Sequence, residues 1–254
     1  MHFRSRFALV ASLAIATPAS AQVSLASRVA QAPDGIVRME FDSRPGVCSR
    51  GGEGISFRQG ASDSPGWNRD PCIAGPVRVA LEVRGGDVAR VHAQVGGRWP
   101  ATPSRITDLG IITPHDASAY LFSLVPRLDA QSERDGALLP AVLADADAIP
   151  PLIALSRSGT VRVRRSADFW LGQMDDPRGL RRLRDVIGDA ANDMGVRENA
   201  IFSLSQSNDE SSFDALMALA RNDTDSRLRG KALFWLAQKH DERVAKLIAE
   251  LVLK

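Results

Sequence analysis

The C-terminal part of the chain spells nearly the same stretch three times, and this repeat limits the possible folds more than any other feature. FWLGQMDD at residues 169–176, FSLSQSND at 202–209 and FWLAQKHD at 234–241 share Phe, Leu, Gln and Asp at four aligned positions. The copies are 33 and then 32 residues apart. A period of this size is typical of solenoids, in which stacked units bury their apolar faces against their neighbours.

The spacing within each copy predicts a helix, a tight turn and a second helix. Val163, Ala167, Trp170 and Leu171 fall on one face of a helix, while Phe169 points to a different side. A helix with two apolar sides needs neighbours on both, and a stacked helix has them. Side chains that favour N-caps precede the first helices (Thr160, Asp193, Asp225) and the second helices (Asp176, Asp209, Asp241).

The same register extends through both helices of each copy. The aligned positions upstream are Val163/Val196/Leu228, Arg164/Arg197/Arg229 and Ala167/Ala200/Ala232, and those downstream are Leu183/Leu216/Ile248 and Val186/Leu219/Leu251. We expect the apolar columns to form the core between stacked helices.

These segments, VRRSADFWLGQMDDPRGLRRL, VRENAIFSLSQSNDESSFDAL and LRGKALFWLAQKHDERVAKLI, resemble short HEAT-like repeats of the kind also seen in phycobilisome lyases, here of an exported bacterial type. The resemblance implies a mainly α protein with an α-solenoid of helix pairs, whose second helices line the concave side. We place the solenoid at residues 113–254, with three clear repeats from about residue 160. Residues 138–155 are expected to be a degenerate copy, and residues 116–125 one further helix.

Residues 22–112 follow a different pattern and predict a small β-rich domain. In residues 77–95, apolar residues alternate in two runs, Val77 to Val83 and Ala89 to Val95, around the turn sequence RGGD. This predicts a hairpin. GIVRMEF from Gly35 and LGIIT from Leu109 are further candidate strands.

The first 21 residues have the features of a secretory signal peptide. A short basic start is followed by an apolar run and by ASA before Gln22. The apolar run is too short for a membrane anchor, and no later stretch is long and apolar enough to cross a bilayer. We therefore expect a periplasmic or secreted protein. Loss of Arg4 and Arg6 balances the remaining charges, so the composition does not favour binding to nucleic acid.

Cys48 and Cys72 are the two cysteines of the chain. In an oxidising compartment, an even pair is most simply one disulfide. The alternative, a metal site, is disfavoured because neither cysteine has another Cys or a His at ligand spacing.

Catalytic motifs are not found. The sequence contains no HExxH, P-loop, GxGxxG, GxSxG or CxxC pattern, so we predict no catalytic residue, metal or cofactor. His92, His115 and His240 lie in different segments and are interpreted as surface or capping residues.

Two groups of residues are candidates for binding. Trp170 and Trp235 occupy one repeat column, where they serve either packing between helices or stacking on a ligand. Arg178, Arg181 and Arg182 crowd one second helix and are hypothesised to contact an acidic partner surface.

The sequence thus favours an exported, non-enzymatic scaffold that binds a protein partner through its helical-repeat surface. The alternative is an enzyme or small-ligand binder whose site lies at the junction of the β-rich domain and the solenoid, near Trp67, His92 or His115. A purely structural component of the cell envelope is a third possibility.

Overall fold

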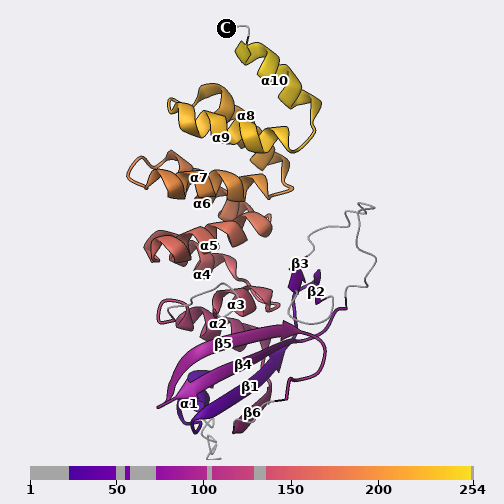
Figure 1. Cartoon of the computed structure of the whole chain (residues 1–254), viewed down its shortest axis with the longest axis vertical. Helices are drawn as coiled ribbons and strands as arrows, with labels where there is room; N and C mark the ends of the chain where they lie inside the picture. The colour runs from indigo at the N-terminus through magenta and orange to yellow at the C-terminus, as the bar shows by residue number, and fades with distance from the viewer. Residues whose placement is uncertain (1–22, 50–54, 58–72, 102–104, 129–135, 253–254) are drawn as a thin grey trace, which may run out of the picture.

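A computed structural model describes residues 23–49, 55–57, 73–101, 105–128 and 136–252. The molecule is elongated, with a β-sheet at one end and a stack of helices that leads away from it (Figure 1). This architecture confirms the predicted fold class, a helical-repeat array with a small N-terminal β-rich part. One continuous core runs from the sheet to the last helices.

The N-terminal sheet has the strand order β5-β4-β1-β6. Its strands are β1 (Gly35–Phe41), β4 (Val77–Arg84), β5 (Asp87–Val95) and β6 (Ile106–Ile111). β1 and β6 are parallel, and the other pairs are antiparallel. β2 (Val47–Ser49) and β3 (Ile55–Phe57) form a separate antiparallel pair. The predicted strand at Leu109 is therefore real, but it begins at Ile106.

The β4–β5 hairpin confirms the predicted turn. Gly85 and Gly86 both have positive φ, 60° and 82°, the backbone geometry that a tight two-residue hairpin turn requires. The alternation predicted for β5 is wrong at its start, because Val88 pairs with Val83 and Ala89 is left outside the ladder. This bulge adds one residue to the strand, so Val88 packs on the core and Ala89 is exposed.

A short helix precedes the sheet, where no helix was expected. α1 (Leu25–Ala30) is capped by Ser24, whose side chain accepts a hydrogen bond from the Ser27 N–H. Val29, which is 1% exposed, inserts into the core. The helix is too short for its periodicity to be recognised in the sequence.

The helical array starts directly after the sheet. Its helices are α2 (Pro114–Leu124), α3 (Leu138–Leu143), α4 (Ile149–Ser158), α5 (Val161–Gln173), α6 (Pro177–Gly188), α7 (Met194–Ser205), α8 (Glu210–Asn222), α9 (Ser226–Ala237) and α10 (Glu242–Val252). The three clear copies form the pairs α5/α6, α7/α8 and α9/α10, and the degenerate copy forms α3/α4. In Figure 1, α5, α7 and α9 make one layer and α4, α6 and α8 lie behind it.

The predicted caps are confirmed at both helices of each unit. Thr160, Asp193 and Asp225 accept backbone N–H groups at the starts of the first helices. Asp176 and Asp209 do so for α6 and α8, and Asp241 Oδ1 accepts the Arg243 N–H at 2.8 Å. Each cap satisfies a backbone donor that a helix start leaves free.

The aligned apolar columns form the core, as expected. The alanine and leucine columns are at most 1% exposed in all three copies: Ala167, Ala200, Ala232, Leu171, Leu204 and Leu236. The helices of the first layer approach closely at Gly172, where a Cβ would lie 2.0 Å from the carbonyl oxygen of Ser203. Gly172 thus brings the backbones of α5 and α7 into contact.

The arginine column links each unit to the one before it. Arg164 Nε donates to Ser156 O at 3.1 Å, Arg197 Nε to Ile187 O at 2.7 Å and Arg229 Nη1 to Asp223 O at 2.8 Å. Each acceptor lies at the C-terminal end of the preceding helix, where carbonyl groups lack helical partners and a positive charge is favourable.

The last helix departs from the predicted register. Val244 and Leu247 are the buried residues of α10, whereas Ile248, which was expected in the column of Leu183 and Leu216, is 42% exposed. α10 therefore presents a different side to its neighbours from α6 and α8.

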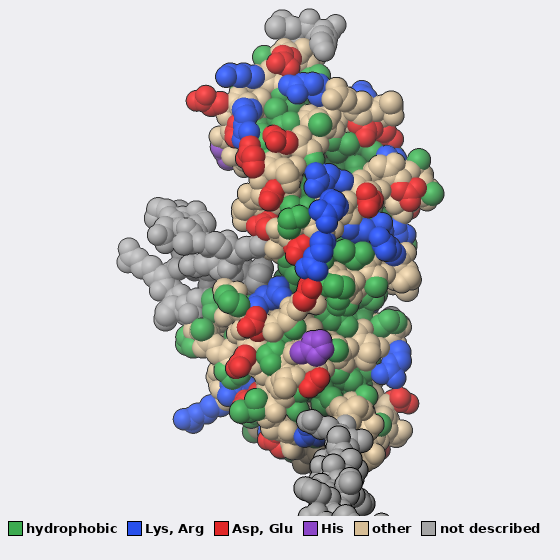
Figure 2. Space-filling view, turned by 180° about the vertical axis from the view of Figure 1, so that it is seen from behind, with side chains coloured by type: hydrophobic (Ala, Val, Ile, Leu, Met, Phe, Trp, Pro, Cys, Tyr) green, Lys and Arg blue, Asp and Glu red, His purple; other side chains and the backbone are tan. Residues whose placement is uncertain are grey.

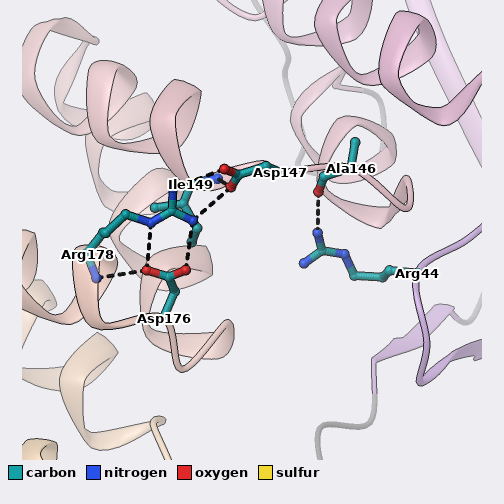
Figure 3. Close-up of polar contacts among 6 residues, drawn as sticks. All are labelled: Arg44, Ala146, Asp147, Ile149, Asp176 and Arg178. Atoms are coloured by element: carbon teal, nitrogen blue, oxygen red, sulfur yellow. Dashed lines mark hydrogen bonds and ion pairs between the residues drawn. The ribbon is translucent and has the colours of Figure 1, made fainter.

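The sheet is joined to the array by backbone hydrogen bonds. Ser43 and Ala144 form an antiparallel bridge, the Arg44 N–H donates to Leu143 O at 2.9 Å, and the Asp145 N–H donates to Asp42 O at 3.2 Å. The Arg44 guanidinium donates to Ala146 O at 2.8 Å (Figure 3). Burial lowers the pKa of Arg44, and the nearby carboxylate of Asp145 opposes this effect.

Several expectations concern residues that are not described. Residues 1–21 and Cys72 lie outside the described ranges, so the signal peptide and the Cys48–Cys72 disulfide stay predictions. β6 ends at Ile111 and α2 begins at Pro114, on either side of the boundary expected after residue 112. Among the described residues, no helix has both the length and the apolar character needed to span a bilayer.

Candidate functional site

Arg178, the first of the three candidate arginines, is held by carboxylates of its own chain. Its guanidinium donates to both oxygens of Asp176, at 3.0 and 2.8 Å, and to both oxygens of Asp147, at 3.0 and 3.1 Å (Figure 3). These hydrogen bonds raise the pKa of Arg178 and lower that of Asp176. Because Asp147 precedes α4 and Asp176 precedes α6, Arg178 connects the turns of two successive units.

The last unit repeats this arrangement. Arg243 Nε and Nη2 donate to the cap residue Asp241 at 3.0 and 2.7 Å, and Nη1 donates to Glu210 of the preceding unit. The guanidinium also lies 4.0 Å from the ring centroid of Phe213. An arginine two residues after the cap Asp of the second helix therefore joins repeats in two of the three copies. This favours a structural role for Arg178.

Arg182 belongs to a buried polar cluster between α4, α5 and α6. Its Nε donates to Ser156 Oγ at 3.0 Å, and its Nη2 donates to Ser156 O at 3.1 Å. The hydroxyl of Ser156 is 2.5 Å from Asp168 Oδ1. Asp168 is 0% exposed, and burial raises its pKa to about 6 against the opposing effects of Ser156, Arg182 and Arg164. Its Oδ2 is buried without a hydrogen bond among the described residues.

Arg181 is the candidate arginine that faces solvent without an ion pair among the described residues. Exposed Arg184 lies on the same helix, and exposed Arg157 on α4. Figure 2 views the molecule from behind and shows Lys and Arg side chains in a column over the middle of the array. Of the three arginines predicted to contact a partner, the structure thus leaves Arg181 the most available.

Trp170 and Trp235 both pack against the core while remaining partly exposed. Trp170 also lines a cavity of about 100 Å³ with residues that follow α2 and precede α5, among them Val125 and Leu138. The indole N–H of Trp235 is buried and has no hydrogen-bond partner among the described residues. These contacts agree with the interpretation of both tryptophans as packing residues, and both side chains remain partly exposed.

A continuous stripe of aromatic rings joins these two tryptophans. Phe169 stacks on Phe202 with ring centroids 6.1 Å apart, and Phe202 lies 4.9 Å from Trp235. Trp170 and Phe234 close the two ends with edge contacts at 5.3 and 4.9 Å. We call Phe169, Trp170, Phe202, Phe234 and Trp235 the aromatic stripe; it crosses α5, α7 and α9 on one side of the array.

The stripe corrects the expectation that the Phe column is covered by neighbouring helices. Phe234 is 54% exposed, and Phe169 and Phe202 are half-buried, because the rings shield one another instead of inserting between helices. The Gln column, which repeats four residues later, is also outside the core: Gln173 and Gln206 are half-buried and Gln238 is exposed. Of the four residue types shared by all three copies, Leu is therefore the one that is fully buried in each copy.

Within α5, α7 and α9 themselves, the basic side chains outnumber the acidic ones. The acidic side chains of α5, α7 and α9 are Asp168, which is buried, and Glu198, which is half-buried. Glu198 pairs with Arg227 and lies 3.8 Å from Lys231. These three residues and Phe234 border an open depression of about 400 Å³. Exposed Arg165 lies one helical turn before Phe169, and its guanidinium forms no ion pair within the described ranges.

The junction of sheet and array contains a different cavity, of about 320 Å³. It is lined by α1, the β4–β5 turn and α2, with Asp87, Tyr120 and Arg127 as its polar residues. His92 and His115 are exposed and do not line it, and Trp67 lies outside the described residues. Within the described part of the chain, no three His, Cys, Asp or Glu side chains gather as metal ligands would.

Comparison with known proteins agrees with the repeat architecture. Residues 149–237, from α4 to α9, match the family described as HEAT repeats, which supports the resemblance to HEAT-like repeats. No curated protein matches the chain. Among solved structures, human deoxyhypusine hydroxylase in complex with glycerol is similar over 49% of this chain and 44% of that chain, with 18% identity and a TM-score of 0.38. The chain thus spans less than half the length of that protein.

Proposed function

We propose that this protein is a non-enzymatic scaffold that binds a protein partner through the surface of its helical array. The observation that carries the proposal is the aromatic stripe, because Phe234 is 54% exposed and the other four rings of the stripe are only partly buried. Exposed apolar surface of this kind, bordered by polar residues, marks interaction sites in soluble proteins. Aromatic and arginine side chains also supply most of the binding energy in protein interfaces.

We propose that the partner contacts Trp170, Trp235 and the rings between them on α5, α7 and α9, and that it contacts Arg181 on α6. Arg178 and Arg182 contribute by holding the units together, because their guanidinium groups already have partners within the chain. Arg181 is suited to a solvent-exposed acidic group at the rim of an interface, where it would increase the rate of association more than the affinity.

We also propose that the partner is met outside the cytoplasm, because residues 1–21 have the pattern of a secretory signal. Sequencing the N-terminus of the mature protein tests this directly. A mature chain that begins at Gln22 is expected, and a chain that retains Met1 in the cytoplasmic fraction would contradict it.

The binding proposal is tested by capture of a partner after mild crosslinking, followed by titration with the purified partner. Two variants test the two proposed contact areas separately. Phe234→Ser changes the aromatic stripe, and Arg181→Glu changes the basic side of α6. A partner that binds the wild-type protein and is weakened by one of these substitutions supports the scaffold. A partner that is unaffected by both, or the absence of any partner, contradicts it.

A binding site for a small molecule is the second candidate, and the junction cavity favours it. At about 320 Å³, the cavity is within the range of small-ligand sites, and Tyr120 and Arg127 offer a hydroxyl and a guanidinium to an anionic group. Native mass spectrometry of the protein purified from its own cells tests this candidate. A retained small molecule that is lost in Arg127→Ala supports it, whereas a mass equal to that of the bare chain contradicts it.

A further inference from the structure

We infer that the junction cavity between α1, the β4–β5 turn and α2 binds a free α-amino acid with an apolar side chain. The inference rests on the proposal that this cavity is a small-molecule site, and it names the class of the ligand. It is carried by three features of the described residues: a buried hydroxyl without a partner, two opposite charges that do not pair, and apolar walls.

Tyr120 brings a polar group to the cavity that the fold itself does not use. The residue is 8% exposed and lines the cavity, and its hydroxyl forms no hydrogen bond within the described part of the chain. A buried tyrosine hydroxyl normally has a partner, because an unpaired polar group is costly in the interior. Burial raises the pKa of Tyr120, and the positive charge of Arg127 opposes this effect. The hydroxyl is therefore protonated at neutral pH and can donate to an anionic group that Arg127 attracts.

Asp87 and Arg127 bring opposite charges to the border of the cavity. Asp87 is the first residue of β5, and Arg127 follows the end of α2. Both are exposed, and neither forms an ion pair with the other or with a third residue in the described ranges. A simple anion would meet Asp87, and a simple cation would meet Arg127. A ligand that carries both charges suits both residues, since its carboxylate can accept from the guanidinium and its ammonium group can donate to the carboxylate.

The remaining wall of the cavity is apolar and includes small residues. Leu124 and Leu128 follow Tyr120 at intervals of four residues, so the three lie on one side of α2 and of the turn that continues it. Ala26 and Ala30 line the cavity from α1 with methyl groups only. The cavity therefore offers space and apolar surface to an aliphatic or aromatic side chain next to its charged groups.

The β4–β5 turn borders the cavity because Gly86 permits a close approach to α1. Its φ is 82°, and a Cβ at this position would lie 3.3 Å from the carbonyl oxygen of Ala30. Asp87, the next residue, is thereby held beside the end of α1. The sheet thus contributes the negative charge of the site and the helical array contributes the positive one, so the site is complete only where the two parts meet.

Isothermal titration calorimetry of the full chain at pH 7 tests the inference. Leucine, valine and phenylalanine are titrated first, and the tightest ligand is then compared with its amide, which lacks the carboxylate, and with its N-acetyl derivative, which lacks the ammonium group. We expect the free amino acid to bind at least tenfold more tightly than either derivative, because each derivative leaves one charged residue of the site without its partner. Absence of binding by all three amino acids, or equal binding of the N-acetyl derivative, would overturn the inference.

Variants at the three polar groups locate the site. We expect Arg127→Gln and Asp87→Asn each to weaken binding at least tenfold, and Tyr120→Phe to weaken it about threefold or more. Arg165→Gln and Asp214→Asn make the same changes at exposed positions of α5 and α8, and should leave the affinity unchanged. Circular dichroism verifies that each variant is folded.

Ala26→Leu provides a second test that removes no charge. Leucine and alanine both favour a helix, so α1 should be kept while the larger side chain occupies the cavity. We expect no detectable binding in this variant. Unchanged affinity in both Ala26→Leu and Arg127→Gln would place the amino acid elsewhere and refute the inference.

The outcomes separate this inference from the proposed function. If native mass spectrometry finds a retained molecule that is lost in Arg127→Ala and is not an amino acid, the small-molecule site stands and the ligand class is wrong. If neither an amino acid nor a retained molecule binds, the small-molecule site fails as well. The scaffold is judged independently, because its proposed contacts lie on α5, α6, α7 and α9 and not at the cavity.

Discussion

Gly172→Ala tests whether close packing of α5 on α7 holds the array together. A Cβ at this position would lie 2.0 Å from the carbonyl oxygen of Ser203 and 2.7 Å from its carbonyl carbon. The carbonyl must retreat by about 1 Å before the first separation reaches even the 3.0 Å below which real Cβ atoms are not found. A gap of that size removes a quarter to a half of the dispersion energy of each affected contact.

The expected cost follows from two opposing terms. Overpacking of this kind costs about 3 kcal/mol when backbone must move. Alanine is favoured over glycine in a helix by about 1 kcal/mol, which offsets part of that cost. We therefore expect Gly172→Ala to lower the free energy of unfolding by about 2 kcal/mol.

Urea denaturation followed by circular dichroism measures this change. The matched control is Gly230→Ala in α9, where a Cβ would meet nothing within 4 Å. We expect the control to gain about 0.5–1 kcal/mol from helix propensity alone. If both substitutions stabilise the protein, the α5–α7 contact does not constrain the array and the reasoning is refuted.

Three further predictions concern other parts of the chain. Asp168→Asn should flatten the pH dependence of stability. Burial raises the pKa of Asp168 to about 6, so the native state of the wild type holds a proton that the unfolded state releases. The stability that this proton contributes is fully present below about pH 4 and is lost as the pH rises through 6. Parallel stability curves for wild type and variant between pH 4 and 7 would exclude this role. Arg197→Gln should lower the free energy of unfolding in a urea titration by about 1–2 kcal/mol, because the charged donor to the end of α6 is lost. The control Arg221→Gln, at an exposed ion pair, should change it by less than about 0.5 kcal/mol. The native protein should contain no free thiol by a maleimide mobility assay under nonreducing conditions, and modification of both Cys48 and Cys72 would rule out the predicted disulfide.

The repeat itself made much of the fold predictable. Because the core columns recur at a fixed period, their helical faces could be assigned from one copy to the next, as with Ala167 and Leu171. The caps could also be predicted from the sequence. An Asp or Thr before an apolar run is favoured there for a local reason, because its side chain accepts the free backbone N–H groups at the start of the helix. These features depend on contacts within one unit or between identical neighbours.

The features that were missed depend on contacts that have no counterpart elsewhere in the chain. Arg178 is neutralised by Asp147, which stands in the degenerate copy where the alignment is weakest. Ile248 is exposed because α10 packs on its neighbours through Val244 and Leu247, a side that the repeat register does not predict. Helical periodicity placed Phe169 away from the core face, but it could not tell whether a helix or only another ring would cover it.

The bridge between Ser43 and Ala144 has a consequence for how such an array could be lengthened. Because the segment after β1 is hydrogen-bonded through its main chain to the turn between α3 and α4, a unit inserted at that turn would have to break those hydrogen bonds. Duplicating the α7–α8 unit in the middle meets no such obstacle, since both of its stacking surfaces already match a neighbouring copy. We therefore expect the protein to tolerate an added unit in the middle of the array, and to be destabilised by one added next to the sheet.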